Sequence, residues 1–269
     1  IFKESSGGLG LVAREGDTAP GTSDAAFSSF GRPALNDGGD TAFLGNLTGT
    51  GVTSSNDTAI FKESSGGLGL VAREGDTAPG TSDAAFSSFG RPALNDGGDT
   101  AFLGNLTGTG VTSSNDTAIF KESSGGLGLV ARTGDTAPGT SDAAFSSFDD
   151  LALNDGGDTA FLGNLTGTGV TSSNDTGIWL GLDGEPLDLI LREGDLLEVA
   201  PGDQRTVSFL RLSSLNSGFL NDLGQIAFQA DFTDNSQGIF VASVDLTPAT
   251  ASVPVPATLP LLGAGLALI

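Results

Sequence analysis

Residues 1–59 read IFKESSGGLGLVAREGDTAPGTSDAAFSSFGRPALNDGGDTAFLGNLTGTGVTSSNDTA, and the same letters follow unchanged as residues 60–118. Residues 119–177 repeat them with five changes: Glu15 becomes Thr133, Gly31-Arg32-Pro33 becomes Asp149-Asp150-Leu151, and Ala59 becomes Gly177. A diverged fourth copy occupies residues 178–238. Such self-similarity predicts a repeat architecture, in which each unit buries its apolar face on its neighbours. Repetition also argues against an enzyme, because an active site needs one unique constellation of residues.

Each unit contains four short apolar segments separated by clusters of Gly, Ser, Asn and Asp. In the first unit they are residues 9–15, 27–35, 41–47 and 58–63. None has a 3.6-residue apolar stripe long enough for a helix, so we expect four strands. The stretch 35–41 (LNDGGDT) predicts a tight hairpin and residues 5–8 (SSGG) a second one, because Asn and Gly tolerate a positive φ. Residues 19–21 (APG) predict a turn, and residues 49–56 a longer polar loop.

These strands predict an all-β fold, a β-propeller-like array of four-stranded antiparallel blades. Grouped by turns, the blades would run over residues 9–65, 68–124, 127–183 and 186–243, with Phe2, Phe27, Phe30 and Phe43 supplying most of each core. Ile1-Phe2 and Ile239-Phe240 would then stand at opposite chain ends, where one could complete the sheet of the other and close a ring. The alternative is a β-solenoid with three rungs of about 20 residues per unit.

Composition excludes several classes of function. The formal charge of −22 and the pI near 4.1 argue against nucleic acid or an anionic membrane surface as a partner. The chain has no Cys and no His, so thiol chemistry, thiolate metal sites and the commonest acid–base residue are missing. The sequence therefore assigns no catalytic, cofactor-binding or metal-binding residue.

The acidic turns make calcium the one cofactor for which the sequence offers candidate ligands. Asp37 and Asp40 flank Gly38-Gly39, and Asp17 follows Gly16, so several oxygen ligands lie close together in the sequence. No segment has the spacing of an EF-hand or of a glycine-rich calcium nonapeptide. Because Asp and Asn are also ordinary turn residues, these clusters have a purely structural interpretation as well.

One octapeptide carries a family resemblance. Residues 36–43 (NDGGDTAF) have the spacing N-x-x-G-x-x-A-F, which recurs at 95–102, at 154–161 and, with different filler, at 221–228 (NDLGQIAF). Arg-x-Gly-Asp followed by Pro-Gly also recurs in all four copies. The chain resembles the bacterial tandem-repeat surface proteins named for the NxxGxxAF motif. That resemblance implies an exported protein and brings no catalytic residues with it.

The C-terminal sequence supports export independently. Residues 253–263 (VPVPATLPLLG) are similar to the PEP-CTERM sorting signal that exosortases read, with Val255 in place of the usual Glu. The apolar run 259–269 is shorter than the ~20 residues that span a bilayer, and no basic tail follows it. We therefore expect a truncated sorting segment over 253–269 behind a linker over 246–252. The missing initial Met likewise predicts a fragment or a processed chain.

Together these patterns predict one β domain over residues 1–245, built from units 1–59, 60–118, 119–177 and 178–238. The expected function is that of an exported, cell-surface structural or interaction protein of a bacterium, without catalytic activity. Its partners would be an extracellular polysaccharide, other envelope proteins and an exosortase-type sorting enzyme, with membrane contact only through the C-terminal segment. The alternatives are a calcium-dependent glycan-binding adhesin and a polysaccharide-cleaving enzyme.

Overall fold

A computed structural model describes residues 1–5, 8–23, 25–82, 84–141, 143–212 and 218–243. Within these ranges the protein is all-β, as the sequence predicts, and every pair of neighbouring strands is antiparallel. Antiparallel pairing is what hairpin meanders require, whereas the rungs of a parallel β-helix would need parallel pairs. The expected linker and sorting segment lie outside the described residues.

The strands form one hairpin and four larger sheets. The N-terminal hairpin consists of β1 (Phe2–Ser5) and β2 (Gly8–Leu11). Sheet I has the order β3 (Ala25–Phe30), β5 (Thr41–Gly49), β6 (Thr58–Ser64), β7 (Gly67–Arg73), with β4 (Ala34–Leu35) on β5. Sheet II repeats it as β8 (Ala84–Phe89), β10 (Thr100–Gly108), β11 (Thr117–Ser123), β12 (Gly126–Arg132), with β9 (Ala93–Leu94) on β10. Sheet III is β13 (Ala143–Leu153), β14 (Thr159–Gly167), β15 (Thr176–Gly181), β16 (Leu187–Arg192); sheet IV is β17 (Leu196–Ala200), β18 (Asp203–Arg211), β19 (Gln225–Phe232), β20 (Gln237–Ser243).

The predicted strands are confirmed, but their grouping into sheets is wrong. The segment expected to open each blade, such as residues 68–74, is the last strand of its sheet, so the sheets span 25–73, 84–132, 143–192 and 196–243. The short Ser-Gly turn after β6 pairs β6 directly with β7, with Ser64 opposite Gly67. The longer connection through Ala78 and Gly80 leads to the next sheet instead. In the repeated unit β1 and β20 both correspond to β6. Neither of them therefore supplies the strand that the other's sheet lacks.

The third unit differs in one strand, and its substitutions explain why. In sheet I the strand is interrupted between β3 and β4, at Gly31-Arg32-Pro33. Proline has no N–H to donate to a ladder. In sheet III, Asp149-Asp150-Leu151 replaces these residues and β13 runs continuously through 11 residues, with a bulge near Asp150 at φ 51°.

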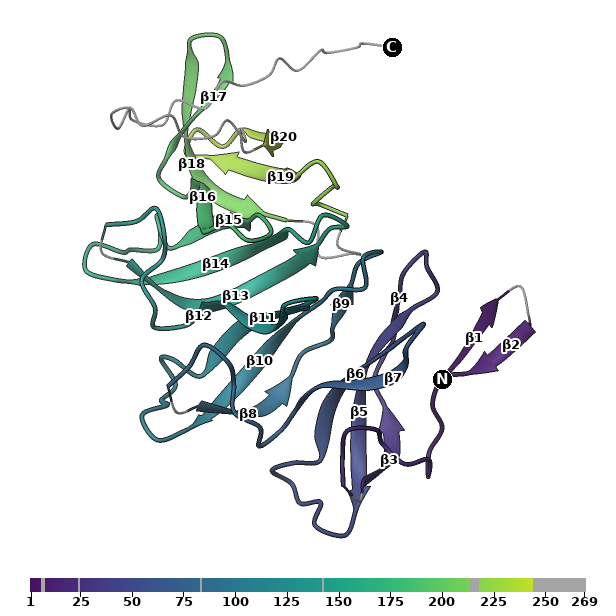
Figure 1. Ribbon diagram of the computed structural model, residues 1–269. Helices are drawn as coiled ribbons and strands as arrows, with labels where there is room; N and C mark the ends of the chain where they lie inside the picture. The colour runs from purple at the N-terminus through teal and green to yellow at the C-terminus, as the bar shows by residue number, and fades with distance from the viewer. Residues whose placement is uncertain (6–7, 24, 83, 142, 213–217, 244–269) are drawn as a thin grey trace.

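Successive sheets pack face to face, because the side chains of each strand alternate between two neighbours. On β6, Ala59 and Phe61 point into the cluster of sheet I with Phe27 and Phe43. Ile60, between them, joins the cluster of sheet II. Figure 1 shows the sheets following one another along an arc, with the β1–β2 hairpin at one end and sheet IV at the other.

Tight aromatic packing explains the glycines in the middle of the sheets. Phe27 and Phe61 meet edge to face at 4.8 Å between ring centroids. A Cβ on Gly45, which lies between them on β5, would come within 3.0 Å of both rings. In sheet IV the smaller Val207 replaces the first of these rings, and Ala230 then takes the place of the glycine.

The same logic accounts for the change of Ala59 to Gly177. In sheet III the larger Trp179 replaces Phe61, fully buried, with its indole Nε1 donating to the Pro138 carbonyl at 3.0 Å. A Cβ at Gly177 would lie 2.8 Å from the indole ring. Glycine at 177 is therefore the complement of tryptophan at 179.

We expect Gly177→Ala to destabilise sheet III by about 2 kcal/mol, because the new methyl group would overpack the indole. Adding Trp179→Phe restores the Ala–Phe pair of units one and two and should recover most of that loss. Urea unfolding of the two single variants and the double variant, followed by circular dichroism, measures the coupling. Additive effects in this cycle would contradict the proposed complementarity.

Candidate functional site: the asparagine ladder

The octapeptide folds into a turn that its asparagine closes on itself. The Asn36 amide oxygen Oδ1 accepts from the backbone N–H of Asp40 at 2.7 Å, and the Gly39 N–H donates to the Asn36 carbonyl at 3.1 Å. Gly39 has a φ of +84°, a conformation that favours glycine. The motif thus requires Asn at its first position and Gly at its fourth, and it turns the chain from β4 into β5.

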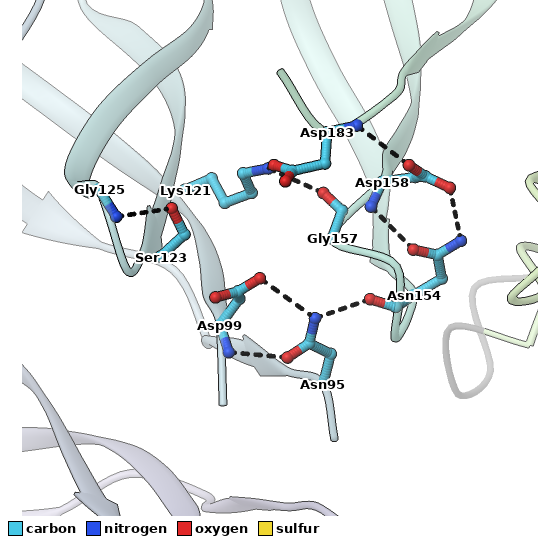
Figure 2. Close-up of polar contacts among 9 residues, drawn as sticks. All are labelled: Asn95, Asp99, Lys121, Ser123, Gly125, Asn154, Gly157, Asp158 and Asp183. Atoms are coloured by element: carbon cyan, nitrogen blue, oxygen red, sulfur yellow. Dashed lines mark hydrogen bonds and ion pairs between the residues drawn. The ribbon is translucent and has the colours of Figure 1, made fainter. Parts of the chain in front are cut away.

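The turns of successive sheets are joined through these asparagines. Asn36 Nδ2 donates to the Asn95 carbonyl at 2.9 Å, Asn95 Nδ2 to the Asn154 carbonyl at 2.8 Å, and Asn154 Nδ2 to the Asn221 carbonyl at 2.8 Å. We call these four residues the asparagine ladder (Figure 2 shows its middle part). The first three side chains are buried, at 3–7% exposure, so each amide depends on these partners for its hydrogen bonds.

A second series of contacts runs beside the ladder. The backbone N–H of Asp37 donates to Asp96 Oδ1 at 2.6 Å, that of Asp96 to Asp155 at 2.8 Å, and that of Asp155 to Asp222 at 3.0 Å. Hydrogen bonds to a carboxylate are stronger than those between neutral groups. The carboxylates of Asp96 and Asp155, the counterparts of Asp37, are therefore engaged in joining one turn to the next.

Lysines form a third connection between sheets. Lys62 Nζ donates to the Gly98 carbonyl at 2.8 Å and pairs with Glu122 at 2.5 Å, and Lys3 makes the equivalent contacts with Gly39 and Glu63 at 3.1 and 2.6 Å. Their side chains are only 20–29% exposed. Local sequence patterns do not reveal these ion pairs, because the two partners lie 60 residues apart.

The third lysine, Lys121, pairs with a different acidic residue. In sheet III the position of Glu122 is taken by Gly181, where a Cβ would lie 2.8 Å from Leu187. Lys121 reaches instead to Asp183, and it keeps the backbone contact with the Gly157 carbonyl at 2.8 Å (Figure 2). Asp183 in turn donates its backbone N–H to Asp158 at 3.0 Å, so the ion pair is attached to the octapeptide turn.

Pairs of carboxyl groups lie at another sheet junction, close to the polar loop before β6. Glu74 is 6% exposed, and its Oε2 accepts from the Thr58 N–H at 3.1 Å. Burial raises the pKa of Glu74, and the hydrogen bond with Asp57 raises it further. In unit three the equivalent Thr133 makes the same contact with the Thr117 N–H at 3.1 Å, without a second carboxyl group.

The corresponding pair between sheets III and IV is the more strongly perturbed. Glu193 is 3% exposed and lies against Asp175 and the Leu210 amide of β18. Burial raises the pKa of Glu193 to about 7, with the hydrogen bond and the charge of Asp175 as further causes. The hydrogen bonds from Leu210 and Thr176 oppose this shift but are weaker causes. Glu193 therefore holds a proton near neutral pH, which favours a shared hydrogen bond with Asp175.

The Arg-x-Gly-Asp segment also has a structural role. The Arg14 guanidinium pairs with Asp17 at 2.9 Å. The backbone N–H of Gly16 donates to the Phe27 carbonyl at 2.9 Å, and the Phe27 N–H donates to the Asp17 carbonyl at 3.0 Å. These bonds bring the segment alongside β3, so the motif closes the edge of a sheet.

In the described ranges neither a cluster of metal ligands nor a long apolar helix is found. No group of three or more acidic residues gathers there in a way that could hold a metal ion. No helix in these ranges is long and apolar enough to cross a membrane.

The lysine bridges and the buried glutamates were not predicted from the sequence. Their signal is their recurrence at matching positions in successive units.

These features define a class: an all-β protein of tandem antiparallel sheets joined by ladders of side chains from a repeated turn. The chain belongs to a family of unknown function, DUF7453, whose sequence profile matches residues 1–257. No curated protein matches it.

Proposed function

We propose that the protein is an exported, cell-envelope-associated structural or interaction protein without catalytic activity, built as a propeller-like array of blades. One observation carries the proposal. Recurring polar side chains of the octapeptide turns, namely the amides of Asn36 and Asn95 and the carboxylates of Asp96 and Asp155, are engaged in contacts between sheets. Residues used in this way set the spacing of a scaffold, and they are not free to act on a substrate.

The blade arrangement is supported by three features of the described residues. Sheets I to IV each have four strands in an antiparallel path, they pack face to face, and they follow an arc (Figure 1). Such an arc repeats its exposed loops at regular intervals. Equivalent weak sites on one scaffold gain avidity for a repetitive polymer. Small-angle scattering of the purified chain tests this arrangement, since an open arc and a compact ring differ in maximum dimension.

Location at the envelope rests on the sequence of residues 253–269, which is similar to an exosortase signal. To test it, the chain is produced behind an export leader in a bacterium that has an exosortase, with the apolar run that starts at residue 259 extended to about 20 residues and followed by a basic tail, together with a variant that ends at residue 252. We expect the extended chain at the cell surface and the shortened variant in the medium. Retention of both at the surface would contradict a sorting role for the segment.

Polysaccharide binding and polysaccharide cleavage are tested together, with the folded full chain on a panel of polysaccharides, first with calcium and then with a chelator. The proposal predicts no release of reducing ends, and binding to a repetitive polymer that exceeds binding to its single sugar unit by ~100-fold. Loss of binding on chelation would favour the calcium-dependent adhesin. Hydrolysis abolished by one carboxylate substitution would establish an enzyme and overturn the proposal.

A further inference from the structure

The polar loop before β6 lies against the Arg-x-Gly-Asp segment that follows β7. Arg73 Nε donates to the Asn56 carbonyl at 2.8 Å. A Cβ on Gly75 would lie 3.2 Å from the Ser55 carbonyl oxygen, so the two backbones are in close contact. The octapeptide turn precedes β5 and the polar loop follows it. This contact therefore lies at the opposite end of the strands from the asparagine ladder, and it joins two repeated motifs into one surface.

The same contact recurs at the two following junctions. Arg132 Nε donates to the Asn115 carbonyl at 2.8 Å, and Arg192 Nε donates to the Asn174 carbonyl at 2.6 Å. Figure 1 shows the three loops, between β5 and β6, β10 and β11, and β14 and β15, following one another along the arc. We call these places the rim sites, and they consist of residues 53–56 with 73–76, 112–115 with 132–135, and 171–174 with 192–195.

The charged side chains of the first two rim sites have unused hydrogen-bonding atoms. Among the residues that the structure describes, the terminal nitrogens of Arg73 and Arg132 donate to no protein group. The exposed carboxylates of Asp76 and Asp135 accept no hydrogen bond from the described residues. A guanidinium that is held at Nε presents its two terminal nitrogens as a fixed pair of donors. Each of these two sites therefore offers paired donors and an acceptor on one tight turn.

The other two copies of the segment use their aspartates within the protein. Asp195 Oδ2 accepts from the backbone N–H of Arg192 at 2.9 Å. Asp17 pairs with Arg14 at 2.9 Å. The first two rim sites are therefore the ones whose aspartates can be tested without loss of an internal contact.

The loop half of each rim site is uncharged, exposed and held in shape. In the first site the Thr53 N–H donates to Asn56 Oδ1 at 2.7 Å, and Asn56 Nδ2 donates to the Gly51 carbonyl at 3.2 Å. The Thr53 and Ser55 hydroxyls lie 3.0 Å apart. A ligand that binds here orders little of the protein, so the entropic cost of binding is small.

We propose that the rim sites bind neutral polysaccharide, with arginine donating to sugar oxygens and aspartate accepting from sugar hydroxyl groups. A sugar hydroxyl both donates and accepts, so adjacent hydroxyls satisfy both side chains. A carboxylated or sulfated polymer fits less well, because Asp76 and the net charge of −22 repel it. This inference rests on the proposed function, and it names the site and the class of polymer that would be bound.

Retardation of the full chain in native gels that contain a soluble neutral β-glucan, α-glucan or mannan tests the inference. Gels with alginate provide the carboxylated comparison. The acceptor variant carries Asp76→Asn and Asp135→Asn, and the control variant carries Glu185→Gln and Asp188→Asn. All four side chains are exposed, and the control changes the net charge equally outside the rim sites. Circular dichroism verifies that each variant is folded.

We expect at least one neutral polymer to retard the parent and the control equally, and to bind the acceptor variant at least ~10-fold more weakly. A donor variant with Arg73→Lys and Arg132→Lys should also bind more weakly, because lysine keeps the charge but lacks the paired donors.

Equal binding of the parent and the acceptor variant would overturn the assignment of the rim sites and leave the proposed function in place. The inference is also overturned if no neutral polymer retards the parent, or if alginate retards it more strongly. Release of reducing ends from any polymer would overturn the proposed function itself.

Discussion

Replacing Asn95 by alanine should lower the free energy of unfolding of sheets II and III by about 3 kcal/mol. The side chain accepts from the Asp99 N–H at 2.7 Å and donates to the Asn154 carbonyl at 2.8 Å, and it is 3% exposed. Its removal leaves the half-buried Asp99 N–H without this acceptor, and it leaves the Asn154 carbonyl with only the Gly157 N–H. An unsatisfied donor of this kind costs roughly 1–3 kcal/mol. The effect should reach both sheets, because the lost bonds close one turn and join it to the next.

The fluorescence of Trp179 reports this change, since it is the single tryptophan and is buried in sheet III. Urea titration of the parent and the variant gives the difference. Asn105→Ala is the matched control, because Asn105 is an exposed asparagine of sheet II that donates to the Ser88 hydroxyl. Its loss should change stability by less than about 0.5 kcal/mol. Equal effects of the two substitutions would show that the ladder adds nothing to stability.

Stability should fall as the pH rises from about 5 to 7, and Glu193 should cause much of that fall. The folded protein holds the Glu193 proton more tightly than the unfolded chain does, because the pKa rises from its ordinary value of 4.5 to about 7. Between these values the native state binds more protons, so the free energy of unfolding decreases with increasing pH. The full change is at most about 3 kcal/mol.

Glu193→Thr tests this prediction by copying Thr133, the residue that the third unit has at the equivalent position. The variant should lose most of the pH dependence that the parent shows between pH 5 and 8, and it should gain stability relative to the parent toward pH 8. Glu185→Thr serves as the control, since Glu185 is an exposed residue in the turn after β15. A difference between variant and parent that stays constant with pH would exclude the shared proton.

Local sequence predicted much of the fold. The strands, the hairpin at residues 35–41 and the polar loops follow from short-range propensities, which depend on neighbouring residues. Whether a strand is interrupted even depends on three residues, which are Gly31-Arg32-Pro33 in one unit and Asp149-Asp150-Leu151 in another. The grouping into sheets was predicted wrongly, because the connections before and after β7 both look like turns in the sequence. Only the pairing of β6 with β7 shows that the connection after β7 leads to the next sheet.

The candidate site was predicted only in part. The octapeptide was recognised from the sequence, because its Asn and Gly are required by the turn in which they lie. The ladder itself joins residues 59 or 67 positions apart, such as Asn95 and Asn154, and Asn154 and Asn221. Lys62 and Glu122 lie 60 positions apart. Such contacts exist only once sheets are stacked, so no local pattern contains them.

The sequence by itself determined the repeated unit, its strands and turns, and the acidic, cysteine-free surface. Tertiary structure alone decided the environment of each copy. Phe2 and Phe61 stand in identical stretches of sequence, yet the first is 62% exposed and the second is fully buried. The physical reason is position in the array. A side chain in a stacked sheet is covered by its own sheet and by its neighbours, and the first hairpin lacks the strands that cover Phe61.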